Sequence, residues 1–552
     1  MGRKMRKNSF VEGTIIAYIA IVITKLLGAL YNIPFYAIIG ERGGVIYSYA
    51  YTIYALFLDI STSGIPVAIS IVISEYATRG MYRSKEKAYS LGLQLVVLIS
   101  LVAFAVLQLL AEPIGRYFIG DMTQGVSVSE VAVAIRTIAV CVLIVPFLSM
   151  RRGYLQGHKC MSAASTSQVI EQIVRIAVVL VGAYVAIFVL DLGTTAGVCV
   201  ALLGAAVGAL VALFYLRRKK KANAELFFEG VDCEEETPAS NKEILRKIFF
   251  YCITIIIVSM ATNVYNIVDM KMLLVGLHNL HYSDEATQVI ASIASSWIPK
   301  ICMIVAALSI GMTSSIAPHM AESYTSGDLH GVNHKLNQAL GTLLVVSLPL
   351  ATGMAMFADP VYRVFYGDSL YGGNILILAL AVNVVGSMTT VVGMAMQSMD
   401  RGKTVCIYTV VGIVLNTALD LPLIYGFNAI GLPAYLGASA ASIVGQTVTV
   451  LLLLGSLRRE LKFTYSPAWR TFWRVLLPTA VMAAVVWLLK WLWPVVETRG
   501  WLLLVQLAVF GGAGALVYAL LAYTTGALFE IVSKDKIQSI LGKFRLGKGK
   551  TR

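Results

Sequence analysis

The sequence predicts an all-α integral membrane protein with fourteen transmembrane helices: two parallel-repeat six-helix bundles plus two C-terminal helices. Composition is the first observation, because 58% of the 552 residues are hydrophobic and 13% are charged, with a mean hydropathy of +0.77. Such values exclude an ordinary soluble domain. Second, apolar runs of roughly 18 residues or more recur along the chain, each long enough to cross a bilayer core of about 30 Å. The third observation is an internal repeat.

The repeat joins two segments that lie 247 positions apart. Residues 110–121 (LAEPIGRYFIGD) return as residues 357–368 (FADPVYRVFYGD), and the same shift places Gly64 on Gly311 without a gap. Six predicted spans separate the copies, and because six is even, both copies have the same orientation in the membrane. We therefore expect two halves related by an axis along the membrane normal, an arrangement typical of transporters with a site between repeats.

The apolar runs define the individual spans. The first run is too long for a removable signal peptide and lacks a small-residue cleavage site. In chain order, the predicted spans are 14–39, 45–74, 88–112, 128–150, 162–188, 192–216, 247–275, 287–317, 334–357, 371–397, 404–426, 434–456, 471–493 and 501–525. The predicted domains are a six-helix bundle (1–216), a polar cytoplasmic linker (217–246), a second six-helix bundle (247–456), helices 13 and 14 (457–525) and a basic cytoplasmic tail (526–552).

The net charge of +14 reflects membrane topology, not nucleic-acid binding. Of the 44 basic residues, 34 fall in the termini and in alternate loops on one side. The loops of the opposite side, here called the basic-poor face, contain only Arg42, Arg116, Arg363 and Arg499. By the positive-inside rule both termini are cytoplasmic. We expect contact with anionic membrane lipids.

Motifs of catalysis and metal binding are missing from the sequence. Its seven cysteines form no CxxC pair and none lies in a loop of the basic-poor face, so neither a disulfide nor a metal site is expected. The sequence contains no GxxxxGK[ST] nucleotide loop and no HExxH motif. We therefore expect no enzyme activity, no catalytic residue and no cofactor.

Ionisable residues within spans are costly and usually face a cavity or a partner. Surplus cations there suit an anionic ligand, above all a phosphate or diphosphate. Glu171 and Arg175 are also spaced as a structural i,i+4 pair, and Asp59 is a candidate counter-charge for Lys25. The candidate cavity cations are Lys25, Lys300, Arg175 and Arg136, and the candidate coupling or counter-charge carboxylates are Asp59, Glu171, Asp269 and Asp420.

Several motifs carry a family resemblance. They are KLLG at 25–28 with IP at 33–34, SGIP at 63–66 with SEY at 74–76, and RGYLQGH at 152–158, followed by SQ at 167–168 and by Glu171, Gln172 and Arg175. On these motifs the chain resembles the MurJ-type flippases of the multidrug/oligosaccharidyl-lipid/polysaccharide (MOP) exporter superfamily, in the branch of stage V sporulation protein B and YtgP-like proteins. The motif residues are Gly28, Gly64, Glu75, Arg152, Gly153, Gln156 and Gly157.

The resemblance implies a MATE/MOP fold whose two bundles enclose a cationic cavity, while helices 13 and 14 form a groove for a lipid tail. The resemblance implies that Lys25 and Lys300 are cations of this cavity. Two departures prevent transfer of the whole phosphate-binding set: Tyr31 stands where many relatives have an arginine, and Leu58-Asp59 where some have an arginine pair.

The predicted function is a flippase of the bacterial plasma membrane that moves an undecaprenyl-diphosphate-linked precursor, lipid II first of all, outward by alternating access. The alternatives are a flippase for another lipid-linked polysaccharide unit, such as capsule, teichoic or spore-cortex material, and a MATE-type drug or cation antiporter. The expected partners are the lipid-linked glycan, membrane lipids and the cell-wall synthesis machinery. We expect a monomer.

Overall fold

In a computed structural model, the chain is helical, and no β-strand occurs among the residues described. Residue contacts divide the chain into two units: residues 1–304 with Thr409–Ser442, and residues 305–408 with 443–552. The structure describes residues 20, 23–24, 27–28, 30–59, 68–69, 72–73, 75–76, 80–158, 160–223 and 239–530.

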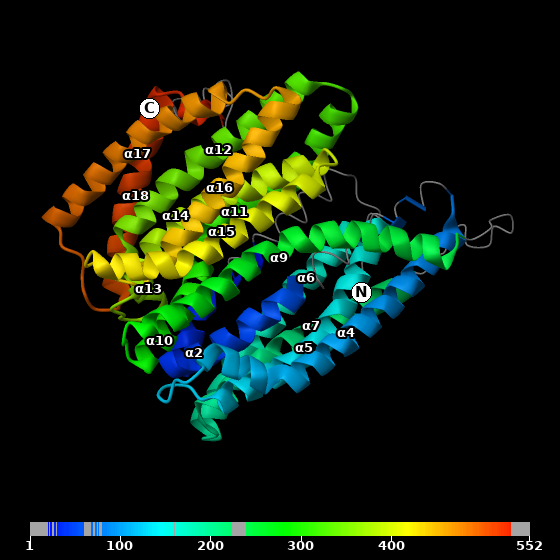
Figure 1. The fold of residues 1–552 in the computed structure, drawn as a ribbon, viewed down its shortest axis with the longest axis horizontal. Coiled ribbons are helices and arrows are strands. Elements are labelled where there is room, and N and C mark those ends of the chain that lie inside the picture. The colour runs from blue at the N-terminus through cyan, green and yellow to red at the C-terminus, as the bar shows by residue number, and fades with distance from the viewer. Residues whose placement is uncertain are drawn as a thin grey trace, which may run out of the picture. The chain divides into compact units, whose positions relative to one another are not determined.

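The first unit contains most of the N-terminal helices (Figure 1). Within it α4 packs against α5, α5 against α7, and α6 against α7. Its helices are α2 (Asn32–Asp59), α4 (Tyr82–Ile119), α5 (Val128–Gly157), α6 (Met161–Ala177), α7 (Gly193–Ala222), α9 (Asn241–Asn279) and α10 (Asp284–Ser292), with π-helical turns η2 (Val178–Gly182), η3 (Val185–Val189) and η4 (Ile293–Trp297).

The second unit contains the C-terminal helices, among which α12 packs against α14 and α17, and α17 against α18. Three helices contribute residues to both units: α11 (Ile298–Thr325), α15 (Gly402–Ala429) and α16 (Leu436–Leu461). The helices within the second unit are α12 (Leu329–Met356), α13 (Ala358–Tyr366), α14 (Gly372–Ser398), α17 (Ser466–Leu492), α18 (Trp501–Thr524) and the short η5 (Ala527–Glu530).

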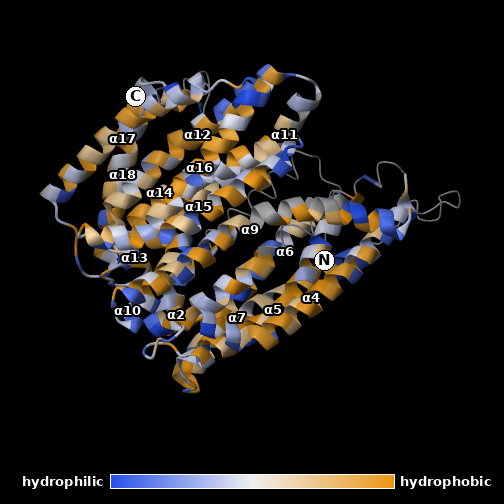
Figure 2. Ribbon diagram, in the orientation of Figure 1, coloured by the Kyte–Doolittle hydropathy of each residue, from blue (hydrophilic) through white to orange (hydrophobic). Residues whose placement is uncertain are grey.

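Hydrophobic residues cover the long helices, as the orange ribbons of Figure 2 show for α4 and α5. Eleven helices of the described part are long and apolar enough to cross a membrane, so the chain is a multi-pass membrane protein. Most exceed the apolar run that predicted them: α4 covers Tyr82–Ile119, where the run predicted 88–112. Helical hydrogen bonding continues past the hydrocarbon boundary because polar side chains there reach water. The total of fourteen spans and the parallel repeat stay predictions.

Two boundaries differ from the prediction. The repeated segments around Pro113 and Pro360 lie just beyond the predicted spans 88–112 and 334–357, but the first belongs to α4 and the second forms α13. Each proline is tolerated in a helix, Pro360 because it lies in the first turn of α13. α7 continues to Ala222 and α9 begins at Asn241, so both helices extend into the segment 217–246, whose role as a linker stays a prediction. Residues 224–238 and the tail after Glu530 lie outside the described part.

Close approach of α6 and α7 depends on glycine. A Cβ atom added at Gly208 would lie 2.7 Å from the backbone oxygen of Glu171, and one at Gly204 would lie 2.9 Å from a Val179 methyl group. Small residues at such positions are typical of packed membrane helices. Gly204 and Gly208 therefore allow α7 to pack closely against the segment that contains Glu171 and Arg175.

Candidate functional site

A half-buried lysine with a buried amine lies in a cage of aromatic rings in the first unit. The Nζ atom of Lys300, in the first turn of α11, lies 3.8 Å from the centre of the Trp297 ring and 4.6 Å and 5.7 Å from those of Tyr47 and Tyr51. This amine is buried and has no hydrogen-bond partner among the described residues. Aromatic faces attract a cation that has lost its water. We call Tyr47, Tyr51, Trp297 and Lys300 the lysine cage.

A second cation meets the same cage. The guanidinium carbon of Arg175 on α6 lies 5.9 Å from the centre of the Tyr51 ring, so Tyr51 contacts both cations. Within the described residues, neither Arg175 nor Lys300 forms an ion pair with a carboxylate. The structure therefore brings together two of the four predicted cavity cations and leaves their positive charge unbalanced.

The aromatic members of the cage were not singled out from the sequence, although a signal was present. Tyr47, Tyr51 and Tyr54 recur at helical spacing on α2, which places them on one face. Trp297 is the last residue of the π-helical turn η4, and its indole N–H donates to the Ser292 hydroxyl at 3.0 Å. Such a turn often marks a functional site, but sequence periodicity does not reveal it.

The motif arginine Arg152 has a structural role. Its Nη2 lies 2.7 Å from Glu171 Oε2, and its Nε donates to Ser167 at 2.8 Å. The predicted ion pair of Glu171 with Arg175 is therefore wrong. Glu171 instead pairs with Arg152, which comes from α5. This ion pair joins the two sequence motifs that carry the family resemblance and leaves Arg175 free to face the cage.

The predicted carboxylates Asp269 and Asp420 form a second polar cluster, which we call the acidic pair. Asn416 donates to Asp269 at 2.6 Å and to Asp420 at 3.4 Å, and Ser442 donates to Asp269 at 2.6 Å. Asp420 has no exposed surface, and its second oxygen Oδ1 has no partner in the described part of the chain. A buried and a half-buried carboxylate that share one amide donor do not readily both carry charge unless a cation joins them.

The remaining predicted residues lie elsewhere. Arg136 lines a surface pocket of α4 and α5. Glu75 forms an ion pair with Lys247 at 3.0 Å. Gly28 permits approach of Gln172, and Gly153, Gln156 and Gly157 belong to the last two turns of α5. Lys25, Gly64 and the side chain of Asp59 lie outside the described part of the chain.

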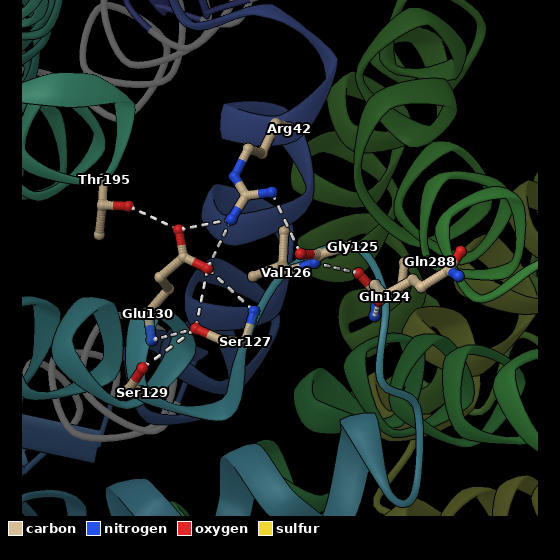
Figure 3. Close-up of polar contacts among 9 residues, drawn as sticks. All are labelled: Arg42, Gln124, Gly125, Val126, Ser127, Ser129, Glu130, Thr195 and Gln288. Atoms are coloured by element: carbon tan, nitrogen blue, oxygen red, sulfur yellow. Dashed lines mark hydrogen bonds and ion pairs between the residues drawn. The ribbon is translucent and has the colours of Figure 1, made fainter.

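A network at the basic-poor end of the first unit joins the α4–α5 loop to α10 (Figure 3). Asp284 Oδ2 accepts the backbone N–H groups of Thr123 at 2.8 Å and Gln124 at 3.2 Å. Gln288, almost fully buried, accepts from the N–H of Val126 at 2.7 Å and donates to the Gln124 carbonyl at 3.1 Å. We call this network the loop clamp. The sequence does not predict the loop clamp, because hydrogen bonds to backbone groups produce no recognisable sequence motif.

Arg42 completes the loop clamp from α2. Its guanidinium donates to the Gly125 carbonyl at 3.1 Å and to both oxygens of Glu130, at 3.0 and 2.9 Å (Figure 3). Glu130 also caps the start of α5 by accepting from Ser127, and it accepts from Thr195 at 3.0 Å. One carboxylate therefore holds α2, α5 and α7 together at this end of the unit.

Two family profiles and several known proteins match this chain in sequence. The profile of the family described as Polysaccharide biosynthesis protein matches residues 10–279, and that of the MatE family matches residues 254–421. The lipid II flippase MurJ of Bacillus subtilis (strain 168) is 27% identical over 558 residues, covering 98% of this chain and 99% of the relative. Stage V sporulation protein B of the same organism is 22% identical over 466 residues, covering 81% and 83%.

Solved structures give the same fold. A lipid II flippase MurJ in an inward closed conformation matches with a TM-score of 0.64 at 15% identity, over 92% of this chain and 98% of the other. A MATE family multidrug transporter in an inward-facing conformation matches with a TM-score of 0.63 at 13% identity, over 81% and 98%. The chain is therefore similar in sequence to the lipid II flippase MurJ and to stage V sporulation protein B, and it shares the fold of solved MurJ and MATE transporters.

Proposed function

We propose that this protein is a flippase that moves a lipid-linked, diphosphate-bearing cell-wall precursor from the inner to the outer leaflet, with lipid II as the first candidate. The observation that carries the proposal is the pair of cations, Arg175 and Lys300, that share the ring of Tyr51 without an acidic partner in the described residues. A diphosphate supplies the negative charge that this site lacks. The relationship to MurJ supports the same class of substrate.

Lys25 is proposed as a third cation of this site, on the strength of its mid-span position in the sequence. Arg175 is suited to bidentate contact with phosphate oxygens, whereas the lysines act as point charges. The cage keeps Lys300 desolvated before substrate arrives, so its amine can exchange ring faces for phosphate oxygens without first losing water.

The second candidate is a flippase for another lipid-linked glycan. It is favoured by a relative from Haloferax volcanii, the probable low-salt glycan biosynthesis flippase Agl15, which is 21% identical over 297 residues. The same cations would bind its phosphate groups, because the lysine cage is proposed to contact the phosphates and not the glycan. A drug-cation antiporter fits less well, since Arg175 and Lys300 would repel its substrate.

We further propose that the acidic pair is the coupling site of an alternating-access cycle. Its ligand set of carboxylate, amide and hydroxyl oxygens suits a proton or a small hard cation such as Na⁺. Binding there would balance the two carboxylates, while the lysine cage holds the anionic substrate. The loop clamp would keep the basic-poor side closed between turnovers.

The test is flipping of fluorescent lipid II in proteoliposomes that contain the full chain. Lys300→Ala and Lys25→Ala should each lower the flipping rate at least tenfold, because each removes a charge-assisted contact. Lys300→Arg should retain part of the activity. The matched control is Lys490→Ala, since this lysine lies near one end of a span, where it contacts the Met356 carbonyl, at 2.7 Å, and the Phe357 ring, at 5.3 Å.

Two results would count against the proposal. Normal flipping by Lys300→Ala at normal membrane levels would remove Lys300 from the substrate site. Equal rates for lipid II and for a neutral lipid with the same glycan would show that the diphosphate is not recognised. A preference for a different glycan on the same diphosphate would instead favour the second candidate.

A further inference from the structure

A second basic site lies on α4 and α5, at the ends of these helices that belong to the basic-poor face. Arg116 and Arg136 there line a surface pocket of about 520 Å³, together with Ser129 and Val133. This volume lies within the range of sites that bind small molecules. The pocket shares no residue with the lysine cage, so the transported substrate does not explain it.

The two arginines differ in their partners. Arg116 forms an ion pair with Glu112, at 2.8 Å, four positions earlier on α4. The Arg136 side chain forms no hydrogen bond or ion pair in the described part of the chain, and only its backbone oxygen is used, by Gln108. The pocket therefore contains one unbalanced positive charge.

Arg136 lies well inside α5, and this depth indicates that its charge needs an anionic partner. It lies nine residues after the N-cap Ser127, so at the rise of an α-helix it is about 13 Å from the end of α5. A helical side chain leans toward the N-terminus of its helix, which directs the guanidinium back toward the headgroup layer. An arginine at this depth is costly unless an anion joins it.

Apolar surface continues from the pocket along the same helices. Leu109 on α4 is 77% exposed and Val133 on α5 is 46% exposed, and both lie in predicted spans. Side chains of this kind contact acyl chains. The pocket thus combines a place for one anionic group with a path for hydrocarbon.

The second copy of the repeat does not reproduce the pocket's charge. Arg363, the equivalent of Arg116, is paired with Asp368. The following helix α14 contains no basic residue, whereas α5 supplies Arg136 in the first copy. The free arginine is therefore a feature of the first copy alone and is not required by the repeated fold.

We propose that this pocket binds the phosphate diester of a glycerophospholipid with one net negative charge, such as phosphatidylglycerol. Arg136 holds the phosphate, and the acyl chains lie along Leu109 and Val133, while Ser129 lines the pocket beside the headgroup. One free guanidinium balances one negative charge, which favours a phosphodiester over a diphosphate.

The experiment is native mass spectrometry of the purified full chain after incubation with phosphatidylglycerol. Arg136→Ala should remove one tightly bound lipid and lower phosphatidylglycerol affinity roughly tenfold or more. Arg136→Lys should retain most of the binding. Arg363→Ala is the matched control, because that arginine lies on the same face and is already paired. Melting temperatures of all variants establish that they fold.

A second variant tests the proposal if Arg136→Ala does not fold. Ser129 is exposed, so Ser129→Asp should fold normally and expel the lipid by repulsion from its new carboxylate. Unchanged phosphatidylglycerol binding in both variants overturns the proposal. Complete competition by millimolar inorganic phosphate would identify a free-phosphate site and overturn the lipid assignment, whereas resistance to phosphate supports it.

Discussion

The amine of Lys300 lies 3.8 Å from the centre of the Trp297 ring, and the two residues are three positions apart where a π-helical turn passes into α11. In a regular α-helix, side chains three positions apart lie on the same face of that helix. The wider turn of η4 directs the indole into the buried cluster of Tyr47 and Phe35. The lysine follows it and is desolvated there.

Tyr51 is the residue at which the two cations can be tested together. Tyr51→Leu removes the ring that both Arg175 and Lys300 contact and should lower flipping about five- to thirtyfold, since a desolvated cation–π contact contributes about 1–2 kcal/mol. Tyr51→Phe keeps the ring face and should remain near the wild-type rate. Equal loss in both variants would show that the hydroxyl, not the ring, is what the site needs.

The ion pair of Arg152 with Glu171 should matter for stability. Both side chains are mostly buried, at 11% and 18% exposure, so Glu171→Ala leaves an uncompensated charge. We expect a loss of about 3 kcal/mol, measured as a lower melting temperature of the purified protein. Glu112→Ala breaks the exposed pair with Arg116 and should cost less than about 1 kcal/mol. Similar losses in both variants would contradict the structural role of Arg152.

Long helices were predictable because length and hydropathy alone specify a membrane span. The run at 372–398 shows this, since the prediction of 371–397 misses α14 by one residue at each end. Partners across helices were less predictable. Glu171 and Arg175 have ideal spacing on α6, but tertiary packing brings Arg152 from α5 closer. Helical spacing describes one helix, whereas the choice of ion partner depends on its neighbours.

Asp420 offers a test of coupling. Asp420→Asn imitates a permanently neutral carboxyl and should slow flipping and abolish its response to an imposed proton or Na⁺ gradient. The control is Asp368→Asn, because this aspartate is 75% exposed and paired with Arg363. Flipping by Asp420→Asn that still follows the gradient would remove the acidic pair from the coupling mechanism.

Membrane orientation can be tested with single cysteines. Gln124, Thr498 and Ser240 are all exposed. The charge distribution predicts that cysteines at Gln124 and Thr498 react with an impermeant thiol reagent in intact cells, whereas one at Ser240 reacts only after lysis. Labelling of Ser240 in intact cells would reverse the proposed orientation of both termini.

The loop clamp should resist opening of the basic-poor side. Ile119 and Tyr366 occupy equivalent repeat positions, but their side chains are buried, so they are unsuited to crosslinking. Gly125 is better placed for a test. Its φ of +87° strains any other residue, and an added Cβ would lie 2.5 Å from Gln288 Oε1. Gly125→Ala should therefore weaken the loop's contact with α10 and favour the open state.

The measurement uses spin labels at Gln124 and Asn279, exposed positions on the loop and at the end of α9. Gly125→Ala should broaden their distance distribution toward longer separations, while Gly120→Ala, at a positive φ but with no atom within 4 Å, controls for backbone strain alone. Conversely, a crosslink between cysteines at Met122 and Gln288, whose side chains meet at 3.8 Å, should stop flipping until reductant is added. A crosslinked protein that flips at the normal rate would show that this loop need not leave α10 during transport.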